Sequence, residues 1–178
     1  MVRYRRNFVP GGTFFFTVTL ADRRSSLLVD HVGLLRAVFR HARDRKSFAV
    51  DAIVILPDHL HAILTLPSGD SDFSGRWKAI EAAFTRSIVA TGKAILRDSR
   101  GEYLLWQRRF WEHTIRNDLD FERCANYVHF NPVKHRLVST PAEWPFSSLH
   151  RYIRAGMLPH DWGGDDRADI ADFGEPIE

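Results

Sequence analysis

The chain has 178 residues, 44% of them hydrophobic, which predicts a single globular domain with one substantial core. Its one cysteine, Cys124, excludes an internal disulfide and any zinc site built from several cysteines. No segment has the run of about 20 apolar residues that a membrane helix needs, so we expect no membrane association and a cytoplasmic location.

The net charge of +3 is unevenly distributed. Residues 165–178 carry six acids and one arginine, a local charge of −5, which leaves residues 1–164 at about +8. We therefore expect residues 1–164 to form the folded domain and residues 165–178 to be an acidic, flexible tail. Arginines interspersed with aromatic residues are typical of a nucleic-acid surface, but a solvated surface over buried rings has the same composition.

The first half of the chain alternates strand and helix patterns. A β-branched and aromatic run after a glycine pair predicts a strand over residues 13–20. Asp30 is the expected N-cap of a helix that runs to about Arg45. The run FAVDAIVIL, residues 48–56, predicts a second strand, and a Pro-Asp turn at residues 57–58 leads into a third strand that should pair with it antiparallel.

The third strand begins with two histidines in alternate positions, within LPDHLHAILTLP. Side chains alternate between the faces of a strand, so His59 and His61 share one face, and the leucines around them share the other. Two imidazoles that point the same way suit one shared metal ion or one phosphate. A pair of histidines with ordinary structural roles is the plainer alternative.

The next two predicted elements are a helix and a fourth strand. Asp72 or Ser71 can cap a helix over about residues 73–91, and RRFWEHTIR, residues 108–116, predicts a fourth strand. The order strand, helix, strand, strand, helix, strand predicts an α+β fold, the ferredoxin-like antiparallel sheet with both helices on one face. In that topology the histidine strand is central.

A further helix near the C-terminus should carry a tyrosine. Asn117 is the expected N-cap, and Pro132 is expected to end the helix at about Asn131. Tyr127 and Asn131 are four residues apart and lie near one face, which Cys124 shares. The plainer alternatives are a packed core tyrosine and an asparagine that caps a short helix opened by Pro132.

Four motifs, in the same order over about residues 3–164, resemble those of the HUH single-tyrosine transposases, and specifically the REP-associated tyrosine transposases. They are RRNFVPGGTFFFTVTLADRR, VDAIVILPDHLHAILTLP, QRRFWEHTIRND and YVHFNPVKHRLV. The family usually has glycine where this chain has Arg136. If that residue ends a helix with positive φ, we expect a strain of about 1 kcal/mol.

The resemblance implies a reaction and a site. Tyr127 would attack a phosphodiester of single-stranded DNA, at hairpins of repetitive extragenic palindromes, and form a 5′-phosphotyrosine with release of a 3′-OH. His59, His61 and Asn131 would hold a divalent metal ion. Imidazole ligands favour manganese, whereas cellular abundance favours magnesium. His113, His129 and His135 are weaker candidates, and His113 could approach the metal only if its strand neighbours the histidine strand.

The partner implied is single-stranded or hairpin DNA, bound by a monomer or a homodimer. The residues expected to contact DNA are Arg5, Arg6, Arg108, Arg109, Trp106 and His129, the last from the surface of the tyrosine helix. Two alternatives stay open: a hairpin-binding module without catalysis, and a histidine-based phosphoesterase. The intact His59, His61 and Tyr127 count against the first, and Ile63, where the histidine-triad hydrolases have a third histidine, counts against the second.

Overall fold

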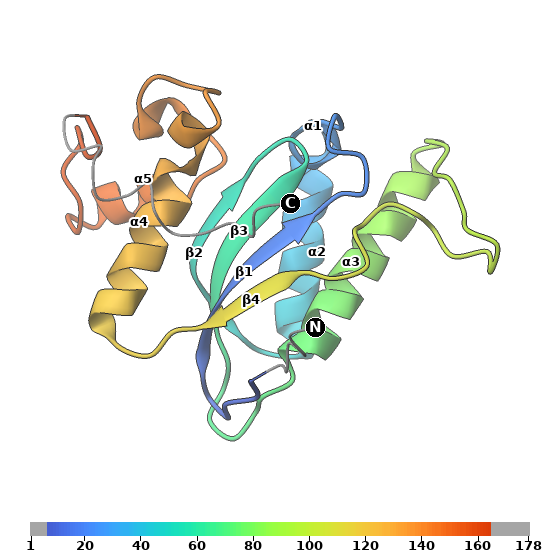
Figure 1. The fold of residues 1–178 in the computed structure, drawn as a ribbon, viewed down its shortest axis with the longest axis horizontal. Coiled ribbons are helices and arrows are strands. Elements are labelled where there is room, and N and C mark those ends of the chain that lie inside the picture. Colours follow the sequence, from blue (N-terminus) through green and yellow to red (C-terminus); the bar gives the residue numbers. More distant parts are fainter. Residues whose placement is uncertain (1–6, 165–178) are drawn as a thin grey trace, which may run out of the picture.

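A four-stranded antiparallel sheet with strand order β2-β3-β1-β4 forms the centre of the molecule (Figure 1). In the computed structural model, which describes residues 7–164, the strands are β1 (Thr13–Thr19), β2 (Ala49–Ile55), β3 (His59–Thr65) and β4 (Trp111–Thr114). The predicted ferredoxin-like α+β fold is confirmed. The histidine strand β3 is central, because it pairs with both β1 and β2.

Two long helices cover one face of the sheet. They are α2 (Val32–Arg45) and α3 (Phe73–Ala90), and the Asp72 side chain caps α3 as predicted by accepting a hydrogen bond from a backbone N–H of its first turn. Their apolar side chains pack against alternate residues of β1 and β3, including Phe14 and Phe16. This layer is the larger of the two hydrophobic clusters among the described residues.

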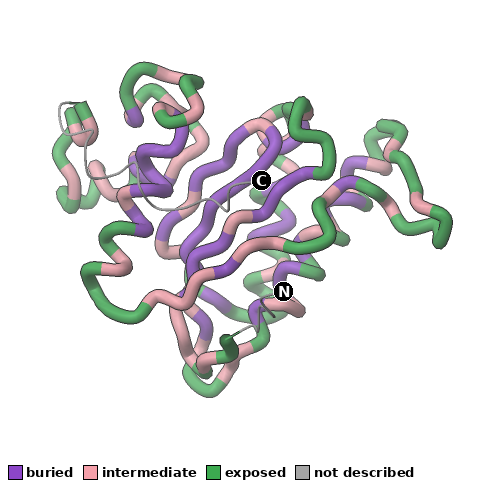
Figure 2. The backbone as a smooth tube through the Cα atoms, in the orientation of Figure 1, coloured by how far each residue is buried: buried purple, intermediate pink, exposed green. Residues whose placement is uncertain are grey.

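The tyrosine helix α4 (Asp118–Lys134) covers the opposite face (Figure 1). Phe15 lies between Phe14 and Phe16 in β1 and therefore packs on this second side, with Cys124 and Tyr127 of α4. The central strands β1 and β3 are buried at most consecutive positions, and the tube in Figure 2 is mostly purple there, which explains why β1 is apolar at consecutive positions. His59 and His61 lie opposite Thr19 and Thr17 of β1, on the face that α4 covers.

Asp30 is not the N-cap of the first long helix, so that prediction was wrong. Asp30 ends a short helix, α1 (Leu27–Asp30), and accepts a hydrogen bond from Ser26 Oγ. The N-cap of α2 is His31. The reason is packing: Leu27 and Leu28 are buried, so the chain forms a helical turn before the periodic pattern begins.

The prediction that α4 ends at about Asn131 was also wrong. The helix continues to Lys134 with Pro132 inside it. Proline disfavours helical geometry in the residue before it but does not forbid it, and so near the helix end it removes only one backbone hydrogen bond. The extra turn carries Lys134 and His135 onto the tyrosine face of the sheet.

The end of α4 confirms the expectation for Arg136. Arg136 has φ 58°, the one positive value among the described non-glycine residues. Its N–H bonds to the carbonyl of Val133, and the N–H of Leu137 bonds to that of Pro132, both at 2.9 Å. This is the Schellman arrangement, in which the left-handed position usually belongs to glycine.

The remaining segments complete the body. A turn of 3-10 helix, η1 (Pro141–Glu143), and α5 (Leu149–Arg154) follow α4, and Ser148 binds the backbone of the outer strand β2. Residues 91–106 form an arm that projects beyond α3 and β4 (Figure 1). No helix in residues 7–164 is long and apolar enough to cross a membrane. The acidic segment 165–178 lies outside the described residues.

Candidate active site

The two strand histidines are buried side by side. The centroids of the His59 and His61 rings are 5.0 Å apart, and the side chains are 2% and 0% exposed. The strand period places both on one face of β3, and α4 covers that face. The predicted proximity of the two imidazoles is thus seen in the structure.

Each imidazole is held through its Nδ1 atom. His61 Nδ1 is hydrogen-bonded to Thr17 Oγ1 at 2.8 Å, and His59 Nδ1 to Asp58 Oδ1 at 2.8 Å. The buried Nε2 atom of His59 has no hydrogen-bond partner among residues 7–164. Such bonds from the far side of the ring are how proteins orient imidazoles that bind a metal through the other nitrogen.

Asp58 is charged because its neighbours outweigh its burial. Burial alone raises the pKa of this carboxyl, but the hydrogen bond from His59 and the Arg23 guanidinium at 2.7 Å produce a net lowering of the pKa. An ionised Asp58 can accept a hydrogen bond from Nδ1–H of His59, and in the neutral imidazole with that tautomer the lone pair is on Nε2. Sequence patterns identified Asp58 only as a turn residue and did not identify Thr17; a carboxylate next to a strand histidine was the available signal.

Tyr127 and Asn131 lie one turn apart on α4, and both are buried. The Tyr127 ring is 5.1 Å from the His61 ring and 5.8 Å from that of Phe15, both in edge-on contact. Neither Oδ1 nor Nδ2 of Asn131 has a hydrogen-bond partner within the described part of the chain, although the residue is 0% exposed. A buried carboxamide without partners is destabilising by itself, and a bound cation is one ligand that would satisfy its oxygen.

Two residues at the end of α4, Lys134 and His135, lie next to Tyr127 and His59. The His135 ring lies 4.8 Å from the His59 ring. Lys134 Nζ donates a hydrogen bond to Tyr127 Oη at 3.3 Å and lies 4.7 Å from the centre of the tyrosine ring. Because the helix was expected to end at Asn131, the sequence did not predict either contact. The adjacent Lys-His pair in the last motif was the available signal for them.

A second group of metal-ligating side chains lies at the start of α4. Ligand atoms of His113, Asp120 and Cys124 are all within 4.8 Å of one another. His113 Nε2 donates to both carboxylate oxygens of Asp120, at 2.9 and 3.0 Å. Burial, aided by the charge of Asp120, raises the pKa of the Cys124 thiol to about 12, so the sulfur stays protonated and neutral. This group ties β4 to α4.

The histidine of the fourth strand is therefore separate from the pair on β3. β4 pairs with β1, not with β3, which removes the condition under which His113 was expected to approach the metal. Glu112 lies opposite Phe16 and hence points to the α2 and α3 side of the sheet.

The expected surface position of His129 is wrong. It is 0% exposed, its Nε2 is bonded to Ser148 Oγ at 3.0 Å, and its ring packs against Tyr152. Burial, with the nearby charges of Arg151 and His150, lowers the pKa of His129 to about 3, so the imidazole is neutral. A fully buried ring offers no atom to DNA at the surface.

The other residues expected to contact DNA differ in how exposed they are. Arg108 and Arg109 are exposed and directly precede β4. Trp106 is half-buried: its indole N–H bonds to Thr85 Oγ1 and the Glu81 carbonyl, so the ring joins the arm to α3. Arg5 and Arg6 lie outside the described residues.

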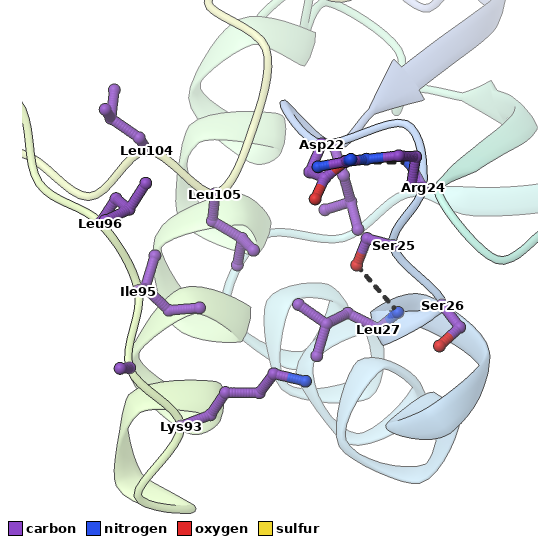
Figure 3. Close-up of a pocket in the computed structure, with 12 residues that line it drawn as sticks. Asp22, Arg24, Ser25, Ser26, Leu27, Lys93, Ile95, Leu96, Leu104 and Leu105 are labelled. Carbon is purple, nitrogen blue, oxygen red and sulfur yellow. Dashed lines mark hydrogen bonds and ion pairs between the residues drawn. The ribbon is translucent and has the colours of Figure 1, made fainter.

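A cavity of about 420 Å³ lies between the arm and the turn that follows β1 (Figure 3). It is lined on one side by Lys93 and several arm leucines, and on the other by Asp22, which pairs with Arg24, and by Ser25. The Ser25 hydroxyl accepts the N–H of Leu27, as the dashed line in Figure 3 marks. The cavity contains no histidine and is distinct from the histidine pair.

Comparison with known proteins gives consistent matches along the whole chain. The chain is 45% identical over 174 residues to the "REP-associated tyrosine transposase" of Escherichia coli K12, which covers 97% of this chain and 95% of that protein. A relative from Haemophilus influenzae is 39% identical over 167 residues, 93% of this chain and 95% of the relative. No protein-family model matches the chain.

A solved structure has the same architecture. It is described as a REP-associated tyrosine transposase bound to a REP hairpin. The two structures superpose with a TM-score of 0.85 at 43% sequence identity, over 100% of this chain and 99% of the other.

Proposed function

The chain belongs to the REP-associated tyrosine transposase family, and on that premise we propose that it cleaves and rejoins single-stranded DNA beside hairpins of REP elements. The observation that carries the proposal is the edge-on contact of the buried Tyr127 with His61, the second of two histidines fixed through Nδ1. The relative of known structure is described with a REP hairpin bound, which supports hairpin DNA as the partner.

Tyr127 is the proposed nucleophile. Its Oη attacks phosphorus, the new O–P bond forms as the P–O3′ bond breaks, and the products are a 5′-phosphotyrosine and a free 3′-OH. Because the phosphoester is exchanged and not hydrolysed, attack by a 3′-OH reverses the step. Phe15 and His61 pack on the ring and limit its rotation, which orients the hydroxyl before DNA binds.

His59 Nε2, His61 Nε2 and Asn131 Oδ1 are the proposed ligands of a divalent cation. When bound, the ion supplies Lewis-acid polarisation of the phosphate, which a phenol with a pKa near 10 needs at neutral pH. The unpartnered His59 Nε2 and the unpartnered carboxamide of Asn131, judged over residues 7–164, fit such an ion. The nitrogen-rich set suits manganese, and magnesium remains the abundant competitor.

The proposed DNA surface includes the exposed Arg108 and Arg109, with Arg5 and Arg6 from the N-terminal segment. We place the end of the folded domain near Gly164, with the acidic segment beyond it. A monomer and a homodimer both satisfy this proposal, since every proposed catalytic residue lies in one chain.

A covalent adduct is the direct test. A labelled hairpin with single-stranded flanks is incubated with the protein and Mn²⁺ and resolved on a denaturing gel. Wild type and the control Tyr152→Phe should both form a protein–DNA adduct, and Tyr127→Phe should form none. A wild-type protein that binds the hairpin without adduct would favour the binding module, and an adduct with Tyr127→Phe would show another nucleophile.

A further inference from the structure

We infer that Lys134 is a catalytic residue of the proposed strand transfer, acting as a fixed positive charge at the nucleophile and the scissile phosphate. The inference rests on the proposed function of Tyr127. Lys134 lies seven residues after Tyr127, about two turns along the same helix, so both side chains emerge on one face. Its Nζ donates a hydrogen bond to Tyr127 Oη at 3.3 Å.

The last turn of α4 determines this contact. The helix continues through Pro132 to Lys134, and the left-handed residue Arg136 follows the C-cap His135, so Lys134 stays in helical register with Tyr127. A helix that ended at Asn131 would have left Lys134 in a loop.

Burial differs sharply between the two partners. Tyr127 is 2% exposed, whereas Lys134 is exposed. The ammonium group therefore meets the hydroxyl at the boundary between the interior and solvent. A DNA phosphate that approaches Tyr127 Oη from solvent comes to the same boundary, within reach of the lysine.

The chemistry of the transfer needs a positive charge at this place. As the Tyr127 O–P bond forms and the P–O3′ bond breaks, the phenol loses its proton to solvent and the departing 3′-oxygen takes one up, so the total number of protons is unchanged. In the transition state, negative charge spreads over Oη and the non-bridging phosphate oxygens. An ammonium group that donates to Oη stabilises this charge, and in the reverse step it stabilises the departing phenolate.

Substitutions of Lys134 separate this role from DNA binding and from packing. The single-turnover rate of adduct formation is measured at saturating protein, and hairpin affinity is measured separately by fluorescence anisotropy. Lys134→Met, which keeps an apolar side chain over the tyrosine ring, should slow the reaction about 100-fold while affinity changes less than about 3-fold. Lys134→Arg should keep the rate within about 10-fold of wild type, because the charge remains.

Lys78→Met is the matched control, since Lys78 is an exposed lysine on α3, across the sheet from Tyr127. It should react at the wild-type rate. If Lys134→Met does not fold, Lys134→Gln, which keeps a hydrogen-bond donor without the charge, should show the same slow reaction.

The inference is overturned if the neutral variants react at the wild-type rate, or if their slower reaction is entirely explained by weaker DNA binding. An equally slow Lys134→Arg would also overturn it, because a role in precise packing would then explain the effect. Failure of the proposed function itself is a different result, namely a wild-type protein that binds the hairpin and forms no adduct.

Discussion

Replacing Arg136 with glycine should stabilise the protein. Arg136 has φ 58°, where a β-carbon crowds the following carbonyl at a cost of about 1–2 kcal/mol. Glycine removes that crowding but loses more backbone entropy on folding, which opposes the gain by about 0.5–1 kcal/mol. The net expectation is an increase of about 0.5–1 kcal/mol in the free energy of unfolding, or a Tm higher by about 1–4 °C for a domain of this size.

Chemical and thermal denaturation of three variants test this reasoning. Arg136→Ala keeps the β-carbon and should gain nothing. Arg123→Gly removes an exposed arginine from the interior of the same helix and should lower the free energy of unfolding by about 1 kcal/mol. The strain argument is refuted if Arg136→Gly is no more stable than wild type, or if Arg136→Ala gains as much.

Three further outcomes are expected at the site and at the DNA surface. Tyr127→Phe should abolish the adduct on a denaturing gel but change hairpin affinity by less than about 2-fold, because only a hydroxyl is removed; a residual adduct would contradict it. Asp58→Asn should weaken Mn²⁺ binding by about 10–100-fold in calorimetry, since His59 loses its ionised partner, and His59→Ala should weaken it further; unchanged affinity would place the metal elsewhere. Replacing Arg108 and Arg109 with alanine should flatten the salt dependence of hairpin affinity, by about 0.7 log units per log unit of salt for each phosphate that the variant no longer neutralises. An unchanged slope would place the DNA on another face.

Local patterns in the sequence were sufficient to predict much of the fold. Alternation of apolar residues and turn residues predicted all four strands within a few positions, and the Asn117 cap predicted where α4 begins. The same period placed His59 and His61 on one face, because it depends only on the geometry of a single strand. The motif order identified the family before any distance was known.

Tertiary packing decided what local patterns do not encode. A strand period does not say which strand is adjacent, so the bond from Thr17 to His61 follows from register alone, and the pairing of β4 with β1 separated His113 from the pair. Helix propensity is a weak preference that tertiary context overrides. In the folded domain α4 packs against the sheet and continues through Pro132, which brings Lys134 to Tyr127. Burial of His129 likewise depends on segments that follow it in the chain, because its partners belong to a later part of the sequence and meet it only when the domain closes.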